Sequence, residues 1–406
     1  MRTVAFVAPY FLDTTIRFVK AAGSLQGVRL FVLSKDSEKK LPPDVLRVVE
    51  DVIPVADPFD ARSILAGALH VRKIAGRVDR LIGAMEELQV PLAEVRQELR
   101  LPGLAVETAK NFRDKGRMKT ILQKAGLPCA RHGRASSREE AIAKADEIGF
   151  PLVAKPPSGS GARSTYRLET STDLEEYLDR YPPSSRQEVL FEEFVRGAEH
   201  SFDSVFVEGK PLWYSIARYY PTPLEVIENP WIQWVVLLPR VVETPEFDDI
   251  RAAAVSALET LGLDTGLTHM EWFRREDGSL AISEVAARPP GAQFTTLISY
   301  AYDFDMYRAW AKLAIFETFE APARSYAAGA AYLRGQGSGS VVQIEGVETA
   351  ARELGALVVE SKLPSIGQAA AGSYEGEGYV ILRHPDTAVV AEGLKRLIQI
   401  LRIELG

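Results

Sequence analysis

Cysteine is almost absent from this chain of 406 residues, which contains only Cys129. A single cysteine excludes an intrachain disulfide and a zinc site built from several thiolates. Cys129 is interpreted as a buried, inert thiol, the ordinary state of a lone cysteine, rather than as a nucleophile. Any catalytic chemistry is therefore expected from other side chains.

Long hydrophobic runs and an excess of positive charge are also missing. No stretch approaches the roughly 20 apolar residues that cross a bilayer, and the apolar run at the N-terminus, interrupted early by Asp13, is too short for a signal peptide. The net charge is −7 with both signs interspersed, unlike a surface that coats nucleic acid. We expect a cytoplasmic protein with small-molecule partners and neither nucleic-acid nor membrane partners. Association as a homodimer is left open.

The dinucleotide fingerprint Gly-x-Gly-x-x-Gly does not follow the first predicted strand, which disfavours a dehydrogenase-type fold. The first hundred residues nevertheless alternate between strand and helix patterns. Apolar runs predict strands at 3–8, 28–33, 52–55 and 79–83, with a helix over 62–77. This alternation predicts an α/β region with a parallel, Rossmann-like sheet, and the chain length allows two or three domains.

The most informative stretch is Thr268–Gln293, which reads as two strands joined at Asp277-Gly278. An Asp-Gly pair between apolar runs predicts a two-residue hairpin turn with positive φ at both residues. Such a turn places Glu271 directly opposite Glu284, with Cβ atoms roughly 4.5–5.5 Å apart. Like charges at that distance repel, so a cation such as Mg²⁺ or Mn²⁺ is expected between them.

The period of two along a strand collects this hairpin's polar residues on one face. They are His269, Glu271, Glu284, Ala286 and Arg288. The alternative is an ordinary solvated face, and a longer turn would shift the register and scatter the set.

Upstream, Phe150–Arg163 predicts a strand running into a loop rich in glycine and serine, with Lys155 at the strand end. Such a loop lets backbone N–H groups approach an anion, and a lysine adds a point charge for phosphate. It lacks the Gly-Lys-Ser/Thr ending of a Walker A loop, and a flexible surface turn is an equal alternative. A single amphipathic helix is predicted over 111–128, and none of its lysines stands out by spacing.

Acids and aromatic residues mark the central part of the chain. A strand ending at Glu192 and Glu193 is followed by a turn at Gly197 and by Glu199 on the next strand. Trp231 and Trp234 lie on a strand predicted over 229–240, either in the core or in the wall of a substrate pocket. Helices are predicted over 246–261 and 300–319. After Tyr326 short glycine-broken strands lead to a closing helix, which suggests a boundary near residue 321.

In order and spacing, four motifs resemble the ATP-grasp superfamily: DK with AGLP, GFPLVAKPPSGSGARS, LFEEFVRGAEHSFD, and MEWF with SEVAARPPGAQ. They cover about half of the chain, and the nearest likeness is to the biotin-carboxylase-like branch, especially L-amino acid ligases. The resemblance implies an α/β and α+β fold with an N-terminal domain over 1–107, an ATP-grasp domain over 108–320 and a C-terminal domain over 321–406. The middle domain would carry a mobile lid at about 129–193.

The resemblance also implies roles for individual residues. Lys115 and Lys155 would hold ATP phosphates, and Glu271 and Glu284 would bind Mg²⁺ or Mn²⁺ beside them. Arg288 would stabilise the transferred phosphoryl group. The mobile loop over the triphosphate would run from Ser158 to Ser164 and include Gly159, Ser160 and Gly161. The adenine would lie along Glu192, Glu193, Phe194 and Val195, and Glu199 would meet the ribose.

Ala286 departs from the family pattern, because many members have an asparagine there as a further metal ligand.

The resemblance implies an ATP-dependent carboxylate-amine ligase that forms an amide or peptide bond through an acylphosphate. Two alternatives are a formate- or bicarbonate-using ligase of the purine-biosynthesis type and a non-catalytic ATP-binding regulatory protein. His269 is predicted to point into the pocket, where it touches substrate or helps to deprotonate the amine; a purely structural histidine is the alternative.

Overall fold

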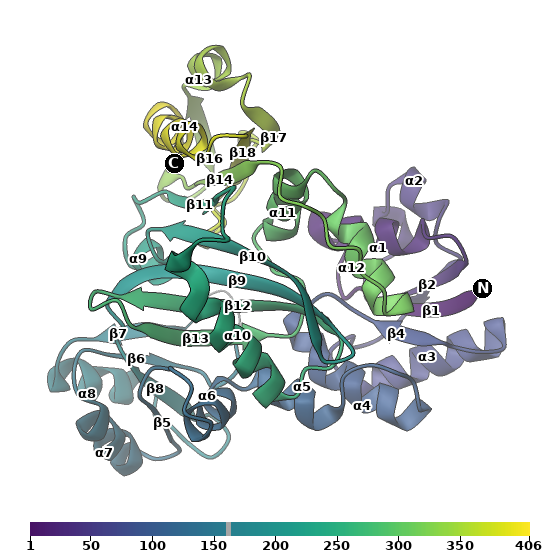
Figure 1. Ribbon diagram of the computed structural model, residues 1–406, viewed down its shortest axis with the longest axis horizontal. Coiled ribbons are helices and arrows are strands. Elements are labelled where there is room, and N and C mark those ends of the chain that lie inside the picture. The colour runs from purple at the N-terminus through teal and green to yellow at the C-terminus, as the bar shows by residue number, and fades with distance from the viewer. Residues whose placement is uncertain (160–163) are drawn as a thin grey trace.

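The computed structural model describes residues 1–159 and 164–406, and the described helices and strands lie within these ranges. The N-terminal part forms a parallel sheet in the order β3-β2-β1-β4 (Figure 1). Its strands are β1 (Arg2–Val7), β2 (Val28–Ser34), β3 (Asp51–Pro54) and β4 (Arg80–Ile82). The predicted α/β region with a parallel sheet is therefore confirmed.

Helices cover both faces of this sheet, which explains its unbroken apolar strands. Ala5 and Val7 face a core shared with α3 (Ala61–Ala75) and α4 (Gln89–Leu99). Val4 and Phe6, one residue out of step, face α1 (Asp13–Gly23) and α12 (Met306–Phe316). A helix from far along the chain thus completes the N-terminal core.

A larger antiparallel sheet runs in the order β13-β12-β9-β10-β11-β14-β18-β17. Its strands are β9 (Gly197–Val207), β10 (Lys210–Tyr220), β11 (Trp234–Leu238), β12 (Gly266–Arg275), β13 (Leu280–Ala286), β14 (Ala327–Leu333), β17 (Val358–Lys362) and β18 (Gly378–His384). Helix α10 (Asp248–Leu261) packs on one face, and α11 (Phe294–Tyr302) packs on the other (Figure 1). Strands on both sides of residue 321 share this sheet, and the division into three domains stays a prediction.

Two smaller sheets flank the large one. The first has the order β5-β8-β6-β7 and packs against α7 (Arg138–Ile148) and α8 (Ser171–Arg180). Its strands are β5 (His132–Ala135), β6 (Leu152–Lys155), β7 (Tyr166–Leu168) and β8 (Val189–Glu193). The second, β15-β19-β16, lies near the C-terminus. It comprises β15 (Gln336–Gly337), β16 (Val341–Glu345) and β19 (Arg402–Leu405), with α13 (Val347–Leu354) and α14 (Thr387–Ile400) beside it.

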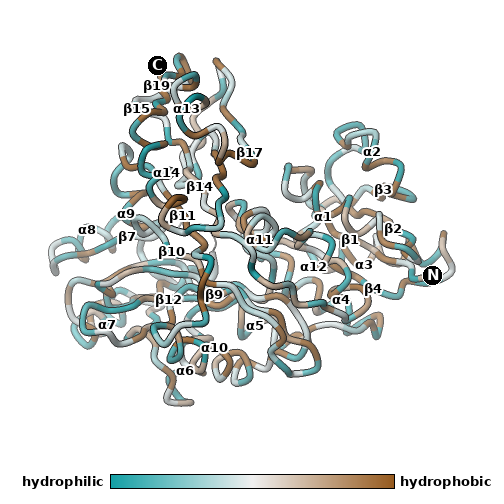
Figure 2. The backbone as a smooth tube through the Cα atoms, turned by 45° about the horizontal axis from the view of Figure 1, so that its top comes forward, coloured by the Kyte–Doolittle hydropathy of each residue, from teal (hydrophilic) through white to brown (hydrophobic). Residues whose placement is uncertain are grey.

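Short helices complete the described chain: η1 (Glu38–Lys40), α2 (Pro43–Leu46), η2 (Glu86–Leu88), α5 (Val106–Arg113), α6 (Lys115–Lys124), α9 (Pro223–Glu228) and η3 (Pro245–Phe247). In Figure 2 the hydrophobic stretches follow the strands of the sheets, where the buried clusters lie. Within residues 1–159 and 164–406, no helix is both long and apolar enough to cross a bilayer.

Two predicted helices are each divided in the structure. The stretch 111–128 contains the end of α5 and the whole of α6, because Asp114 leaves the helical conformation and its carboxylate accepts a hydrogen bond from the Arg117 N–H at 2.8 Å. Such a side-chain cap starts a new helix. The stretch 300–319 is likewise divided between α11 and α12, with Asp303 at a φ of 53° between them.

The turn of the 268–293 hairpin differs from the predicted two-residue turn. Gly278 has a φ of 84°, Asp277 does not have a positive φ, and Arg275 pairs with Ser279 across a three-residue loop. The loop alone would shift the register, but a β-bulge between Glu271 and Trp272 shifts it back. Glu271 therefore faces Glu284 as predicted, although the predicted turn is wrong.

Gly197 is a point of close backbone approach, at the start of β9 rather than in the predicted turn. Its φ is 154°, and an added Cβ would lie 2.1 Å from the carbonyl oxygen of Arg274. We expect Gly197→Ala to lower the free energy of unfolding by about 1–3 kcal/mol, the usual cost of forced overpacking, as measured by urea denaturation. Gly266→Ala is the control, because its Cβ would meet only ordinary contact at 3.6 Å. Equal stability of the two variants would contradict this prediction.

Candidate active site

One pocket contains most of the site residues predicted from the sequence. It is lined by alternate residues of β12, Phe273, Glu271 and His269, which lie on one face of the strand. Glu284, Ala286 and Arg288 line the same pocket from β13 and the segment after it. The predicted common face of the hairpin thus exists.

The two lysines reach this pocket from a helix and from a strand. Lys115 is the first residue of α6, and its Nζ lies 2.8 Å from a Glu284 carboxylate oxygen and donates to the Gly159 carbonyl at 2.8 Å. Lys155 ends β6, and its Nζ lies 3.0 Å from Glu192. Phosphate groups placed here would meet two cationic side chains.

Electrostatic effects keep these groups charged despite burial. Burial alone would raise the pKa of Glu284, but Lys115 and Lys155 outweigh it and lower the pKa to about 2. Burial alone would lower the pKa of Lys155, and the carboxylates of Glu192 and Glu284 raise it instead. Glu284 and Lys155 thus stabilise each other's charged forms.

The pKa of Glu199 is shifted in the opposite direction from that of Glu284. Burial, followed by the nearby negative charge of Glu271, raises its pKa well above the usual value for a glutamate. Added positive charge in the pocket would relieve this repulsion.

The donor set for a metal ion is incomplete within the protein. In the described ranges, no group of three or more His, Cys, Asp and Glu side chains is arranged to hold a metal ion. A cation at Glu271 and Glu284 would need further oxygen ligands from phosphates and water. That requirement fits Mg²⁺, which binds proteins through one or two carboxylates together with substrate phosphates.

His269 is held by an acid that the sequence did not single out. Its Nδ1 lies 2.6 Å from the Asp203 carboxylate on β9, and its Nε2 lies 3.7 Å from Glu271. Burial alone would lower the pKa of His269, but Asp203 and Glu271 raise it to about 9. Both ring nitrogens therefore face acidic side chains.

Aromatic side chains form the wall beyond His269. They are Tyr219, Trp234, Phe294 and Tyr374, and each lines the pocket. Trp234 is 1% exposed and contacts the other three rings, so it belongs both to the core and to the wall. The prediction that Trp231 lies in the core or in the pocket wall is wrong, because Trp231 is 63% exposed and does not line the pocket.

An apolar slot lies at the other end of β12, next to Phe273. Its lining includes Ala130, Val153, Phe194, Val195 and Ile282. Glu193 also lines the pocket, and its carboxylate bonds Arg131 at 2.9 Å and Arg275 at 2.5 Å. A flat, mostly apolar group such as adenine suits this slot.

The predicted loop residues are only partly placed. Gly159 lines the pocket, whereas Ser158 is exposed and does not. Ser160 and Gly161 lie outside the described residues. Cys129 is partly buried, and burial raises the pKa of its thiol, as expected of an inert cysteine.

Several residues of the site had not been selected from the sequence. Lys119 is fully buried, 3.5 Å from Glu192, and Glu86 binds Arg288 from the N-terminal sheet. Glu86 follows the carboxyl end of β4, and ligands commonly bind at that edge of a parallel sheet. The position of Glu86 after a predicted parallel strand was the one sequence feature that could have indicated its place near the site. No sequence feature indicated Lys119, because its burial depends on tertiary packing.

An ATP-grasp domain lies within this chain. Residues 120–302 match the family model of the ATP-grasp domain, so the chain carries that domain. Among its relatives, an L-arginine-specific L-amino acid ligase of Bacillus subtilis is 24% identical over 64% of this chain and 63% of its own length. The chain thus spans less than two thirds of that ligase.

Solved structures have the same fold. The L-amino acid ligase of Bacillus licheniformis has a TM-score of 0.80 at 19% identity, covering 100% of this chain and 99% of the other. N5-carboxyaminoimidazole synthetase of Staphylococcus aureus, in complex with ADP, has a TM-score of 0.71 at 13% identity, covering 98% and 97%. At these identities the likeness establishes the fold.

Proposed function

We propose that this protein is an ATP-dependent carboxylate-amine ligase that acts on amino acids and yields ADP and phosphate. One observation carries the proposal. A single pocket brings two lysines, a pair of facing glutamates and an arginine together between an apolar slot and an aromatic wall. Ligases of amino acids among the relatives support this choice of substrate.

The slot beside Phe273 would take the adenine, and Glu199 would meet the ribose. Lys115 and Lys155 would then bind the phosphates, and Lys115 would exchange Glu284 and the Gly159 carbonyl for phosphate oxygens. Mg²⁺ held by Glu271 and Glu284 would supply positive charge to the phosphate oxygens. Ala286 offers no ligand, which favours water at that position.

The proposed reaction has two steps. A substrate carboxylate oxygen attacks the γ-phosphorus, the bond from that phosphorus to the bridging oxygen of ADP breaks, and an acylphosphate forms. The amine nitrogen then attacks the acyl carbon, phosphate leaves, and the nitrogen loses a proton to solvent. Phosphoryl transfer depends mainly on positioning and charge neutralisation. Lys115, Lys155 and Arg288 provide that charge from the protein.

His269 is better suited to binding a substrate than to deprotonating one. Asp203 bonds its Nδ1 and the Glu271 carboxylate lies 3.7 Å from its Nε2, so both ring nitrogens already face acidic side chains. The ring lies between the acids and the aromatic ring of Phe294, 5.5 Å away. Any contact that the ring makes with a substrate would therefore lie at the aromatic end of the pocket.

ADP release tests the function directly. We expect release from Mg²⁺-ATP only when an amino acid pair is present, with an equimolar dipeptide seen by mass spectrometry. Formate or bicarbonate with an amine serves as the comparison. ATP binding without amine-dependent release would instead favour a non-catalytic ATP-binding protein. Release with formate or bicarbonate and an amine, but not with amino acid pairs, would favour the purine-type ligase.

A further inference from the structure

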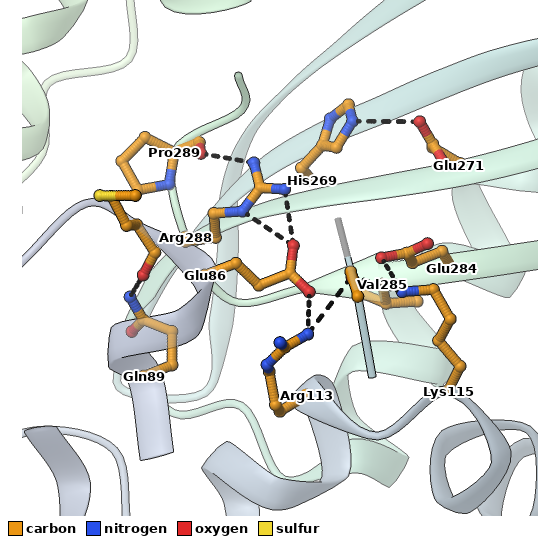
Figure 3. A network of polar contacts seen from close by, with 12 residues as sticks. Glu86, Gln89, Arg113, Lys115, His269, Glu271, Glu284, Val285, Arg288 and Pro289 are labelled. Atoms are coloured by element: carbon orange, nitrogen blue, oxygen red, sulfur yellow. Dashed lines mark hydrogen bonds and ion pairs between the residues drawn. The ribbon is translucent and has the colours of Figure 1, made fainter. Parts of the chain in front are cut away.

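A buried glutamate from the N-terminal sheet joins two arginines at the edge of the pocket. Glu86 begins η2, four residues after the end of β4, and is 4% exposed. One carboxylate oxygen accepts from Nε and Nη2 of Arg288 at 3.3 and 2.8 Å, and the other accepts from Nη1 of Arg113 at 2.9 Å (Figure 3). Both oxygens of Glu86 are therefore bound to guanidinium groups.

These bonds determine how Arg288 is oriented. Its Nη1 also donates to the carbonyl of Pro289 at 2.8 Å. A guanidinium has five N–H donors in a rigid plane, so three are used by Glu86 and Pro289 and two remain. Because Arg288 lines the pocket, the remaining donors are the ones available to a bound anion.

The second carboxylate oxygen of Glu86 is connected through Arg113 to the proposed phosphate site. Arg113 donates to the Gly159 carbonyl at 3.3 Å, and Lys115 donates to the same oxygen at 2.8 Å. Lys115 in turn pairs with Glu284. A continuous set of polar contacts thus joins Arg288 to the lysine at the proposed phosphate site.

A buried carboxylate is a costly way to join two parts of a protein. Removing the charge from water costs several kcal/mol, and well-packed apolar side chains often stabilise an interface equally well. The arrangement at Glu86 instead fixes direction, since a planar guanidinium held at Nε and Nη2 cannot rotate freely. Orientation is what an arginine that stabilises a phosphoryl group requires.

We infer that Glu86 is a positioning residue for Arg288, so that the N-terminal sheet sets the geometry of the phosphoryl-binding end of the pocket. This inference rests on the proposed function. It goes beyond it by assigning part of the catalytic geometry to Glu86, which follows the N-terminal sheet and does not itself line the pocket.

Glu86→Gln tests the inference, because it keeps the shape of the side chain and removes its charge. We expect kcat for ADP release to fall about 10–100-fold, as expected for a misplaced reacting group, while the KM and dissociation constant for Mg²⁺-ATP change less than about threefold. Glu317→Gln is the matched control: Glu317 pairs with Arg80 of β4 at 3.2 Å and does not line the pocket. It should leave kcat unchanged.

Two further variants separate positioning from a structural role. In an Arg288→Lys background, Glu86→Gln should cost little further activity, because both changes act on the same group. Independent, multiplying effects would overturn the inference, and so would a Glu86→Gln protein that melts earlier but keeps the wild-type kcat. If Glu86→Gln does not fold, Glu86→Asp keeps the charge and shifts the carboxylate, and an intermediate kcat is expected. Wild-type kcat in that variant would overturn the inference.

A binding measurement distinguishes failure of this inference from failure of the proposed function. Aluminium fluoride should tighten binding of Mg²⁺-ADP to the wild-type protein in calorimetry, since it mimics a phosphoryl group in transfer. Glu86→Gln should lose that enhancement and keep its affinity for ADP. If the wild-type protein releases no ADP with any substrate, this measurement alone decides about Glu86. Absence of any enhancement in the wild-type protein overturns the inference.

Discussion

Glu284→Gln is expected to lower kcat for ADP release at least about 100-fold while the protein stays folded. A cation held by Glu271 and Glu284 would supply several kcal/mol of charge stabilisation in phosphoryl transfer, and about 1.4 kcal/mol corresponds to a factor of ten. The substitution also removes the negative charge that pairs with Lys115 at 2.8 Å. Steady-state ADP release at saturating Mg²⁺-ATP, with circular dichroism as the check on folding, measures the effect.

Glu276→Gln is the matched control for this change. Glu276 lies in the loop of the same hairpin, is exposed and does not line the pocket. It should leave kcat within a factor of two, as surface substitutions usually cost little. Retained activity in Glu284→Gln would refute the metal-binding role of the facing glutamates.

The second large effect is expected for Arg288→Lys. Lysine keeps the positive charge, so Glu86 is not left as an unpaired buried carboxylate, but it cannot reproduce the planar set of donors. We expect kcat to fall about 10²–10³-fold, the usual cost of losing a donor to a developing negative charge. Binding of Mg²⁺-ATP in calorimetry should change little, because the two lysines remain.

Arg274→Lys provides the comparison on the same hairpin. Arg274 pairs with Asp249 and donates to the Gly278 carbonyl, away from the pocket. Its replacement should affect turnover by less than a factor of three. An Arg288→Lys enzyme with wild-type kcat would show that Arg288 does not stabilise the transferred group.

The hairpin shows how far local patterns carry a prediction. Alternation along 268–293 correctly placed His269, Glu271, Glu284 and Arg288 on one face. The turn was predicted wrongly, because a three-residue loop and a β-bulge at Glu271 together give the same pairing as a two-residue turn. Turn length and bulges depend on packing against β9, which the hairpin sequence does not contain.

Helix boundaries show the same limit. The helix predicted over 111–128 ends and restarts at Asp114, and this break places Lys115 at the first position of α6, beside Glu284. The amphipathic spacing of apolar residues continues across Asp114, so it did not reveal that the helix breaks there. The cap at Asp114 depends on a side-chain hydrogen bond that periodicity does not reveal.

The sequence by itself determined the parallel N-terminal sheet, the polar face of the hairpin and the lysine at the end of 151–155. Each of these follows from short-range periodicity, because side chains on a strand alternate between two faces. Tertiary structure alone decided that Glu86 meets Arg288, that Asp203 contacts His269, and that Trp234 lines the pocket while Trp231 does not. Glu86 and Arg288 are 202 residues apart in the chain, and only the packing of separate sheets brings them within 2.8 Å.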